Sequence, residues 1–327
     1  MSEPYDVAIV GYGPVGQTLA ILLAQRGWRI GVFEKQPSPY PLPRAVHFDH
    51  EVARVLQAAG LGEALPRLTE PADVYEWKNA AGETLLRIGS RDAGLSGWPE
   101  ANMFSQPELE RALDARVRAL SNVAVHRGAE VVDLEPRGEG VGVIVQCDDR
   151  RHEVQARAVV GCDGANSFAR RRVGARVTDL GFFFDWLIVD VFPHQRRVWD
   201  PINEQICDPE RPTTVVSGGP GRRRWEFMRL PGEDVAHLNS EATAWRLLQP
   251  WHLHATNAIG GVAGHLDGGI RDVRGKYAQW FRDNHVGVVL QRPDFHIFGT
   301  GAAIEDGPRL VRALRSALEG RSEGSIR

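Results

Sequence analysis

Cysteine is scarce in this chain of 327 residues, which contains only Cys147, Cys162 and Cys207. The three stand singly, with no Cys-x-x-Cys spacing. This pattern excludes a disulfide framework, a cysteine-rich zinc site and a redox dithiol, and it is typical of proteins in a reducing compartment. We therefore expect a cytoplasmic protein without a bound metal.

Long apolar runs and a strong charge imbalance are also missing. No stretch approaches the roughly 18 apolar residues of a membrane span, and no secretory signal precedes the first expected strand. The formal net charge is only −3, so neither nucleic acid nor a membrane is an expected partner. The length and the 43% of hydrophobic residues predict a globular chain of about two domains.

A glycine-rich turn follows the first expected strand, residues 5–10. It reads Gly-Tyr-Gly-Pro-Val-Gly over residues 11–16 and precedes a helical pattern over 18–26. Gly11 permits the tight turn, Gly13 lets a pyrophosphate approach, and Gly16 allows close helix packing. A second strand, 29–33, ends at Glu34, which can accept hydrogen bonds from a ribose. The alternative is a glycine turn without a ligand, and the motif alone does not separate NAD from FAD.

A second turn, far downstream, is more specific. The apolar run 156–160 leads into Gly-Cys-Asp-Gly-Ala-Asn-Ser-Phe-Ala-Arg over residues 161–170. It predicts a strand, then an Asp163-Gly164 turn, then a helix. An Asp-Gly-x-x-Ser-x-x-Arg turn in this place indicates one kind of flavoenzyme.

Two polar residues between these turns are candidate cofactor contacts. Arg44, in a loop that follows Glu34, could reach a phosphate, or it could be an exposed loop arginine. Gln106 opens a helix expected over 107–120 with Ser105 as N-cap, and capping alone would explain it. A helix over 50–59 is expected to end at Gly60. Strands are expected over 123–127 and 130–135, and 140–147 and 152–158 should form a hairpin.

The region from 178 to 230 predicts a separate sheet, with strands over 186–192, 205–207, 213–217 and 223–230. Alternation places Trp225 and Phe227 on one face. These rings suit a flat aromatic substrate, but core packing explains them as well. The arginine run 222–224 could attract a carboxylate, although a solvated hairpin end is the preferred interpretation.

These motifs together resemble the class A, single-component FAD-dependent aromatic hydroxylases. The segments 186–190, 207–214 and 222–233 resemble most closely the 3-(3-hydroxyphenyl)propionate hydroxylase branch. The likeness runs from about residue 4 to 250 and resumes over 267–319, where Arg292-Pro293-Asp294 matches a small thioredoxin-like C-terminal domain.

The resemblance implies a fold, a reaction and a set of site residues. The fold is α/β: a Rossmann-like FAD-binding domain of the glutathione-reductase type, an inserted mixed β-sheet substrate domain and a partial thioredoxin-like C-terminal piece. FAD reduced by NADH or NADPH would react with O₂ and hydroxylate a phenol next to its hydroxyl group. His47 would assist deprotonation of the phenol, although a loop histidine without a role is the alternative. The implied cofactor contacts are Gly11, Gly13, Pro14, Val15, Gly16, Glu34, Lys35, Arg44, Gln106, Val131, Asp163 and Gly164, and the implied substrate contacts are Trp225 and Phe227.

The resemblance also assigns domain boundaries. The FAD-binding domain would comprise 1–70 and 100–178, and the substrate domain 71–99 and 179–250. Residues 251–266 would be a linker or deletion junction. The thioredoxin-like segment would be 267–327, with a helix at 275–282, strands at 286–290 and 295–298, and a helix at 308–318. A homodimer is expected.

One feature of the family is missing. Class A hydroxylases carry a third FAD motif that begins Gly-Asp, and this dipeptide occurs nowhere in the sequence. The last FAD strand and its helix would then be absent, which would expose an apolar sheet edge. A truncated, catalytically impaired paralogue that binds FAD weakly or acts through a partner is therefore the alternative function. An NAD-dependent dehydrogenase is a third reading, and the Asp163-Gly164 turn argues against it.

Overall fold

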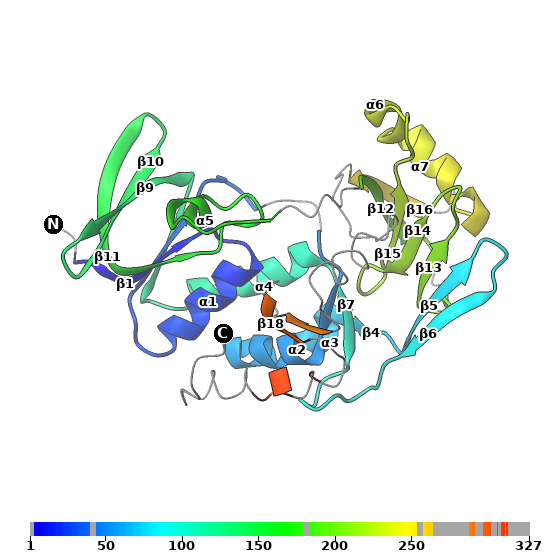
Figure 1. Ribbon diagram of the computed structural model, residues 1–327, viewed down its shortest axis with the longest axis horizontal. Helices are drawn as coiled ribbons and strands as arrows, with labels where there is room; N and C mark the ends of the chain where they lie inside the picture. Colours follow the sequence, from blue (N-terminus) through cyan, green and yellow to red (C-terminus); the bar gives the residue numbers. More distant parts are fainter. Residues whose placement is uncertain are drawn as a thin grey trace. The chain divides into compact units, whose positions relative to one another are not determined.

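The computed structural model describes residues 3–39, 44–178, 184–195, 197–253, 258–263, 288–291, 297–301, 306, 309, 310 and 312. The chain forms two compact units. The larger comprises Met1–Val177 with Phe184–Asp267, and the smaller comprises Thr178–Phe183 with Gly268–Arg327. The larger unit holds both of the main sheets (Figure 1).

The first sheet has six strands in the order β8-β2-β1-β11-β10-β9. Their bounds are β1 Tyr5–Val10, β2 Ile30–Glu34, β8 Val123–Arg127, β9 Ala129–Arg137, β10 Gly140–Cys147 and β11 Arg150–Gly161. β8, β2, β1 and β11 run parallel, whereas β9, β10 and β11 form an antiparallel meander. The predicted strands and hairpin of this region are confirmed, with shifts of a few residues at their ends.

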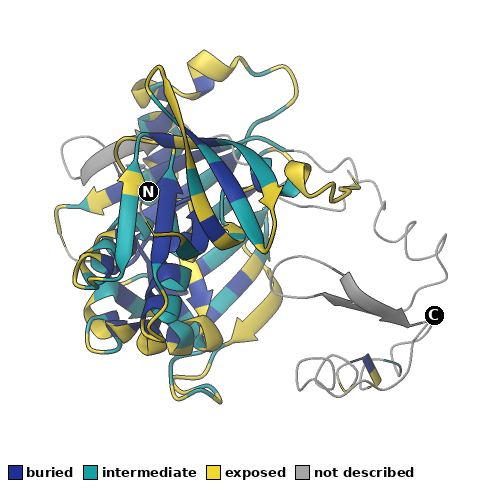
Figure 2. Ribbon diagram, turned by 90° about the vertical axis from the view of Figure 1, so that its left-hand side faces the viewer, coloured by how far each residue is buried: buried dark blue, intermediate teal, exposed yellow. Residues whose placement is uncertain are grey.

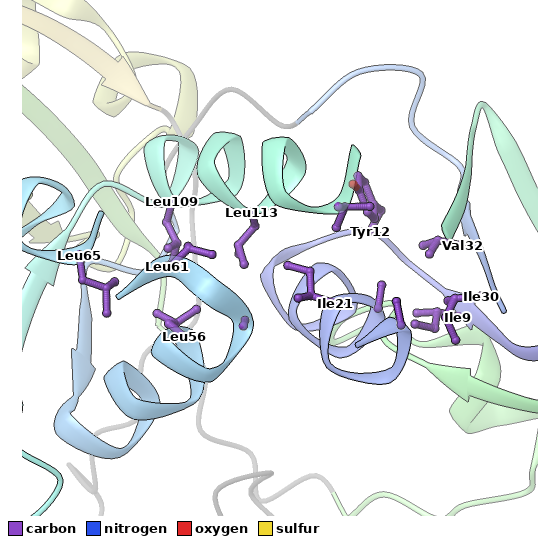
Figure 3. Packing of buried hydrophobic residues seen from close by; sticks show 14 of the residues in the cluster. Ile9, Tyr12, Ile21, Ile30, Val32, Leu56, Leu61, Leu65, Leu109 and Leu113 are labelled. Atoms are coloured by element: carbon purple, nitrogen blue, oxygen red, sulfur yellow. The ribbon is translucent and has the colours of Figure 1, made fainter. Parts of the chain in front are cut away.

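Helices pack on the parallel part of this sheet. α1 (Pro14–Ala24) lies beside α4 (Gln106–Arg118), and α2 (His50–Leu56) continues into the π-helix η1 (Gln57–Leu61). Gly60 lies inside η1 with φ of 92°. This left-handed backbone interrupts the expected helical pattern at Gly60, and glycine adopts it without the strain that an L side chain would cause. Figure 3 shows Leu109 and Leu113 of α4 directed toward Leu56, Leu61 and Ile21, which joins these helices into one core. A short helix, α3 (Leu65–Leu68), completes this part.

A small sheet follows the helical layer. Its strands, in the order β3 (His47–Asp49), β7 (Ala101–Phe104) and β4 (Thr69–Pro71), are antiparallel. β7 leads directly into α4. This small sheet therefore places His47 and the start of α4 next to each other in the fold.

The second main sheet has seven strands in the order β16-β12-β15-β14-β13-β5-β6. Their bounds are β5 Val74–Asn79, β6 Thr84–Gly89, β12 Trp186–Pro193, β13 Asn203–Cys207, β14 Thr213–Ser217, β15 Arg223–Met228 and β16 Ala258–Ala263. The helices α6 (Val235–Leu238), α7 (Glu241–Leu248) and η2 (Gln249–Trp251) follow β15. Residues of α6 and α7 share a buried cluster with one face of the sheet. Figure 2 shows buried residues in both strands and helices, and exposed residues mainly in loops and at the outer ends of the elements.

Residues 258–263 correct one expectation. The sequence gives no strand between 251 and 266, yet β16 pairs with β12 from Pro193↔Ala258 to Ile188↔Ala263. Strand pairing uses main-chain groups, so a segment rich in small residues can join a sheet edge without the alternation that a strand normally shows. This part of the proposed linker is therefore a sheet strand.

In the C-terminal region, β17 (Val288–Gln291) and β18 (Ile297–Gly301) form an antiparallel pair. The two predicted strands are confirmed with shifted ends. The helix expected over 275–282 lies outside the described residues, and only residues 309, 310 and 312 of the second one are described, as helical. The thioredoxin-like assignment stays a prediction.

The two halves of β11 have different neighbours. β10 pairs with β11 only from Arg150 to Ala156, whereas β1 pairs with Ala156 to Gly161. Among the residues that the structure describes, the last part of β11 therefore has a neighbouring strand on one side alone. Val160 is 36% exposed there. An open sheet edge with exposed apolar side chains is a site for pairing with another strand.

Candidate functional site

The glycine-rich turn lies where β1 leads into α1. Gly11 has φ of 101°, and a Cβ atom on it would lie 2.4 Å from the carbonyl oxygen of Cys162. A Cβ atom on Gly16 would lie 2.2 Å from the carbonyl oxygen of Gly11. Both glycines are thus required by the fold. Gly13 differs, because apart from its neighbours in the chain no described atom lies within 4 Å of the position of its Cβ.

The open space at Gly13 lies at the N-terminus of α1. Gly13 is the N-cap residue, no side chain caps this helix end, and Pro14 occupies its first turn. Val15 is 69% exposed there. Free amide groups and the helix dipole make such an end a binding site for phosphate. The residues present therefore fit the pyrophosphate of a dinucleotide.

The Asp163-Gly164 turn meets the glycine-rich turn at the ends of two adjacent parallel strands. The amide of Cys162 donates to the carbonyl of Val10 over 2.7 Å. In addition, a Cβ atom on Gly11 would lie 2.9 Å from the Cα atom of Asp163. Gly164 has φ of 79° with open space at its Cβ position. Two motifs separated by about half of the sequence thus form one surface.

Asp163 is held by the turn that follows it. Its Oδ1 accepts from Ser167 Oγ at 2.6 Å, and its Oδ2 accepts from the amide of Ala169 at 3.0 Å. Ser167 in turn caps α5 (Phe168–Arg172) by accepting from the amide of Arg170. Burial raises the pKa of Asp163, but the hydrogen bonds outweigh it, so this pKa lies below its usual value. Asp163 is therefore a fixed carboxylate.

Glu34 supports the glycine-rich turn from the end of β2. Its Oε2 accepts from the amide of Tyr12 and its Oε1 from the amide of Gln36, each over 2.8 Å. A carboxylate oxygen has a second lone pair, so these bonds leave capacity for a ribose hydroxyl. Tyr12 is fixed further by its hydroxyl, which donates to Asp114 of α4 over 2.9 Å.

Arg44 and Gln106 are brought together. The amides of Arg44 and Ala45 donate to Oε1 of Gln106 over 3.2 and 2.9 Å. Gln106 is the first residue of α4, and its amide group also donates to Glu110 over 2.8 Å. Burial is the main cause that raises the pKa of Glu110. The charge of Arg44 lowers this pKa, whereas the charge of Glu34 raises it. The start of α4 therefore links two of the predicted cofactor residues.

His47 lies on β3, three residues from Arg44. The residue keeps contact with solvent although the surrounding chain partly desolvates its ring, and its main chain pairs with Met103 of β7. Desolvation lowers the pKa of His47, and the charge of Asp49 opposes this effect. The imidazole is therefore neutral near pH 7, which is the form that can accept a proton.

Three of the remaining predicted cofactor residues have less specific surroundings. Lys35 is exposed after the end of β2. The side chain of Val131 is buried in the core beside β10, which leaves its main chain as the group that could face a cofactor. Pro14 contributes a helix start without an amide donor.

Trp225 and Phe227 lie in the core of the second sheet. They are 0% and 2% exposed and pack with Leu238 and Leu248 of the covering helices. Trp225 makes edge contacts with Trp199 and Trp251, at ring-centroid distances of 5.6 and 5.8 Å. This burial supports the packing interpretation. A contact of these rings with substrate stays a prediction. The rings themselves present almost no exposed surface.

The arginine run 222–224 corrects another expectation. It is not a solvated hairpin end, because Arg223 and Arg224 are 1% and 0% exposed. Arg222 pairs with Glu108 of α4 and donates to Ser105 Oγ. Arg224 pairs with Asp190 of the adjacent strand. These partners are distant in the sequence, so the local composition could not reveal the pairing.

Comparison with known proteins agrees with this geometry. Residues 4–325 match the family model described as "FAD binding domain". The chain is 40% identical over 240 residues to "Probable NADH-specific resorcinol 4-hydroxylase" of Rhodococcus jostii strain RHA1, a match that covers 71% of this chain and 45% of that protein. It is 34% identical over 237 residues to "3-(3-hydroxy-phenyl)propionate/3-hydroxycinnamic acid hydroxylase" of Paraburkholderia xenovorans strain LB400, covering 72% of this chain and 37% of that protein. The chain thus spans less than half the length of these relatives.

Solved structures show the same fold. p-Nitrophenol 4-monooxygenase from Pseudomonas putida DLL-E4 superposes with a TM-score of 0.67 at 18% identity, over 82% of this chain and 67% of that one. Aklavinone-11 hydroxylase in complex with FAD and aklavinone gives a TM-score of 0.63 at 22% identity, over 80% of this chain and 54% of that one. The α/β fold with an FAD-type domain and a second mixed sheet is confirmed. The chain belongs to the FAD-binding domain family, and its relatives within that family are aromatic hydroxylases. No helix in the described part of the chain has the length and apolar character to span a membrane.

Proposed function

We propose that this member of the FAD-binding domain family is a flavin-dependent monooxygenase that uses NADH and O₂ to hydroxylate a phenol next to its hydroxyl group. One observation carries the proposal: the glycine-rich turn and the Asp163-Gly164 turn meet at adjacent strand ends, beside an uncapped helix N-terminus. The names of the relatives favour NADH and a small phenol such as resorcinol or 3-(3-hydroxyphenyl)propionate.

The residues of this chain would bind and orient the reactants, while the bound flavin would supply the activation of O₂. The amides at the start of α1 would hold the pyrophosphate, and Glu34 would accept from the adenosine ribose. Arg44 would contribute a cation, and Asp163 a fixed carboxylate near the cofactor. His47, neutral near pH 7, would accept the phenolic proton. In the overall reaction NADH, a proton, O₂ and the phenol give NAD⁺, water and the phenol with one additional hydroxyl group.

The visible spectrum of the purified chain tests the cofactor. Flavin bands near one equivalent per chain, present on purification or after reconstitution with FAD, support the proposal. Consumption of NADH with resorcinol or 3-(3-hydroxyphenyl)propionate, and detection of the added hydroxyl by mass spectrometry, test the reaction. The control substrate is 1,3-dimethoxybenzene, which lacks the phenolic proton. If the chain binds flavin but forms no hydroxylated product, the proposed hydroxylase activity is contradicted.

A second candidate function is a truncated relative that binds FAD weakly or acts through a partner. It is favoured by the missing Gly-Asp dipeptide and by the last part of β11, which among the described residues has a neighbouring strand only on the side of β1. A colourless protein that FAD cannot reconstitute, and that elutes as an aggregate or with a partner protein, would favour this candidate.

The compartment and the assembly of the chain are part of the same proposal. All three cysteines are free thiols in the structure, which suits the reducing cytoplasm that we propose. A homodimer is proposed from the resemblance alone, and light scattering of the purified protein would test it.

A further inference from the structure

A fully buried arginine connects the second sheet with the segment that carries Arg44. Arg224 of β15 forms two parallel hydrogen bonds with Asp190 of β12, Nε to Oδ1 and Nη2 to Oδ2, each over 2.8 Å. Its third nitrogen, Nη1, donates to the carbonyl oxygen of Arg44 over 2.9 Å. A bidentate pair of this kind fixes the plane of the guanidinium. The orientation of Nη1 toward Arg44 is therefore set by Asp190.

The same residue is held from its other side. The amides of Arg44 and Ala45 both donate to Oε1 of Gln106, as described above. Gln106 stands at the start of α4, whereas Arg224 stands on β15. The main chain of Arg44 is thus bound at its N–H by one element and at its C=O by another.

These two elements are also tied directly to each other. Arg222, next to β15, donates to Ser105 Oγ over 2.5 Å and pairs with Glu108 of α4. Gly219 lies so close that a Cβ atom on it would approach the main chain of Phe104 and Ser105 to 2.9 Å. The β14–β15 turn and the start of α4 therefore form one frame, and Arg44 is attached to both of its sides.

We infer that Arg224 is a positioning residue for the cofactor: by fixing the carbonyl of Arg44 it holds the Arg44 guanidinium in its binding position. This inference rests on the proposed function, in which Arg44 contacts FAD. It assigns to the second sheet a role in cofactor binding, because Asp190 orients Arg224 and Glu226 Oε1 lies 3.7 Å from its Nη1. A substitution that removes the charge of Asp190 or Glu226 would then alter cofactor binding through Arg224.

The variant Arg224→Lys tests the attachment without any cofactor. Lysine keeps the positive charge beside Asp190 but cannot make the bidentate pair and the bond to Arg44 at the same time. Amide hydrogen exchange of the 44–49 segment should accelerate by about fivefold or more, as expected when a local tether is lost. The matched control is Arg229→Lys, since Arg229 also bonds an aspartate, Asp185, and a main-chain carbonyl, that of Glu233. The control should leave exchange in 44–49 unchanged.

Gln106→Leu serves as a second variant in case Arg224→Lys fails to fold. It removes the acceptor on the other side of Arg44 and should accelerate exchange in the same segment. Unchanged exchange in a folded variant at position 224 would overturn the attachment, and so would equal acceleration in Arg229→Lys.

A double-mutant cycle on FAD affinity tests the positioning role. Arg44→Gln and Arg224→Lys should each raise the Kd for FAD by about tenfold, the loss of one charge-assisted hydrogen bond. If Arg224 acts through Arg44, the double variant should bind no more weakly than Arg44→Gln alone. Multiplying effects would mean that Arg224 acts independently, which overturns the inference. If the unaltered chain binds no FAD, the proposed function fails, and so does the cofactor role of Arg224; the exchange measurement still decides whether the attachment exists.

Discussion

Arg223 and Arg224 are neighbours on one strand and lie on opposite faces of the second sheet. Arg224 shares its face with Asp190 and is bonded through all three guanidinium nitrogens. Arg223 shares its face with Trp225 and the covering helices. Its Nη1 donates to the carbonyl of Ile202, whereas its Nε and Nη2 have no hydrogen-bond partner among the residues that the structure describes. Its guanidinium lies 4.5 Å from the centre of the Trp199 ring.

The difference shows that the two faces have different tasks. The helix-covered face is an apolar core in which burial lowers the pKa of Arg223 to about 10. The opposite face carries paired charges and contacts the segment that holds Arg44. We therefore propose that the face of Asp190 and Arg224 is the cofactor side of the sheet, and that the face of Trp225 and Phe227 packs against the covering helices.

The largest expected effect comes from Arg224→Met. The change leaves the Asp190 carboxylate, whose side chain is only 14% exposed, without its partner, so the free energy of unfolding should fall by about 3–5 kcal/mol. Urea denaturation followed by circular dichroism measures this loss. The variant Arg224→Met with Asp190→Leu removes both charges and should recover much of the stability. A single variant as stable as the original protein would contradict the assignment of this pair as a buried anchor.

Phe227→Leu should produce a smaller change on the helix-covered face. It keeps an apolar side chain in the core and should lower the free energy of unfolding by about 1 kcal/mol. Its KM for the phenolic substrate should stay unchanged, since the ring has no open surface beside it. A raised KM at unchanged stability would instead make Phe227 a substrate contact, and the contrast between the faces would fail.

Arg223→Met should change stability least among the buried positions of this strand. Among the described residues no carboxylate forms an ion pair with Arg223, and only the more distant Glu204 and Glu70 act on its charge. Methionine keeps an apolar stem against Trp199, so the expected change is below about 1 kcal/mol in either direction. Thermal unfolding at pH 7 compares it with Arg224→Met. A loss as large as that of Arg224→Met would show that Arg223 has a compensating partner in the folded protein.

His47 should give the smallest effect, visible as a pH dependence. Its pKa in the folded state is lowered from 6.5, so the unfolded state binds more protons in the window just below 6.5. The contribution of neutral His47 to the free energy of unfolding should therefore be fully present above pH 6.5. It should decline slightly as the pH falls below 6.5 toward the pKa of His47 in the folded state. His47→Gln should flatten this slope between pH 7 and 5. An unchanged slope would assign the dependence to other groups.

The cofactor-binding turns could be predicted from sequence because their geometry is local. The sequence spacing of Gly11, Gly13 and Gly16 predicts a strand, a turn and a helix start. Asp163 is held by residues that follow it within six positions of the sequence. The structure adds that Gly11 packs against Cys162. That contact joins motifs that the sequence shows only separately.

The parts that could not be predicted depend on partners far along the chain. Arg224 is 34 residues from Asp190 and 180 from Arg44, and no local pattern distinguishes such a pair from a charged surface. β16 joins its sheet through main-chain bonds, which leave no mark in side-chain alternation. In both cases tertiary pairing decided the structure.

Gly13→Val tests the central claim, that the end of α1 binds the pyrophosphate of FAD. Gly13 has φ of −75°, which any residue adopts, and open space surrounds its Cβ position. The variant should therefore unfold at the same temperature as the unaltered chain, while its Kd for FAD, measured by quenching of flavin fluorescence, rises by at least about 30-fold, or 2 kcal/mol. Equal affinity of the two proteins for FAD would contradict the account.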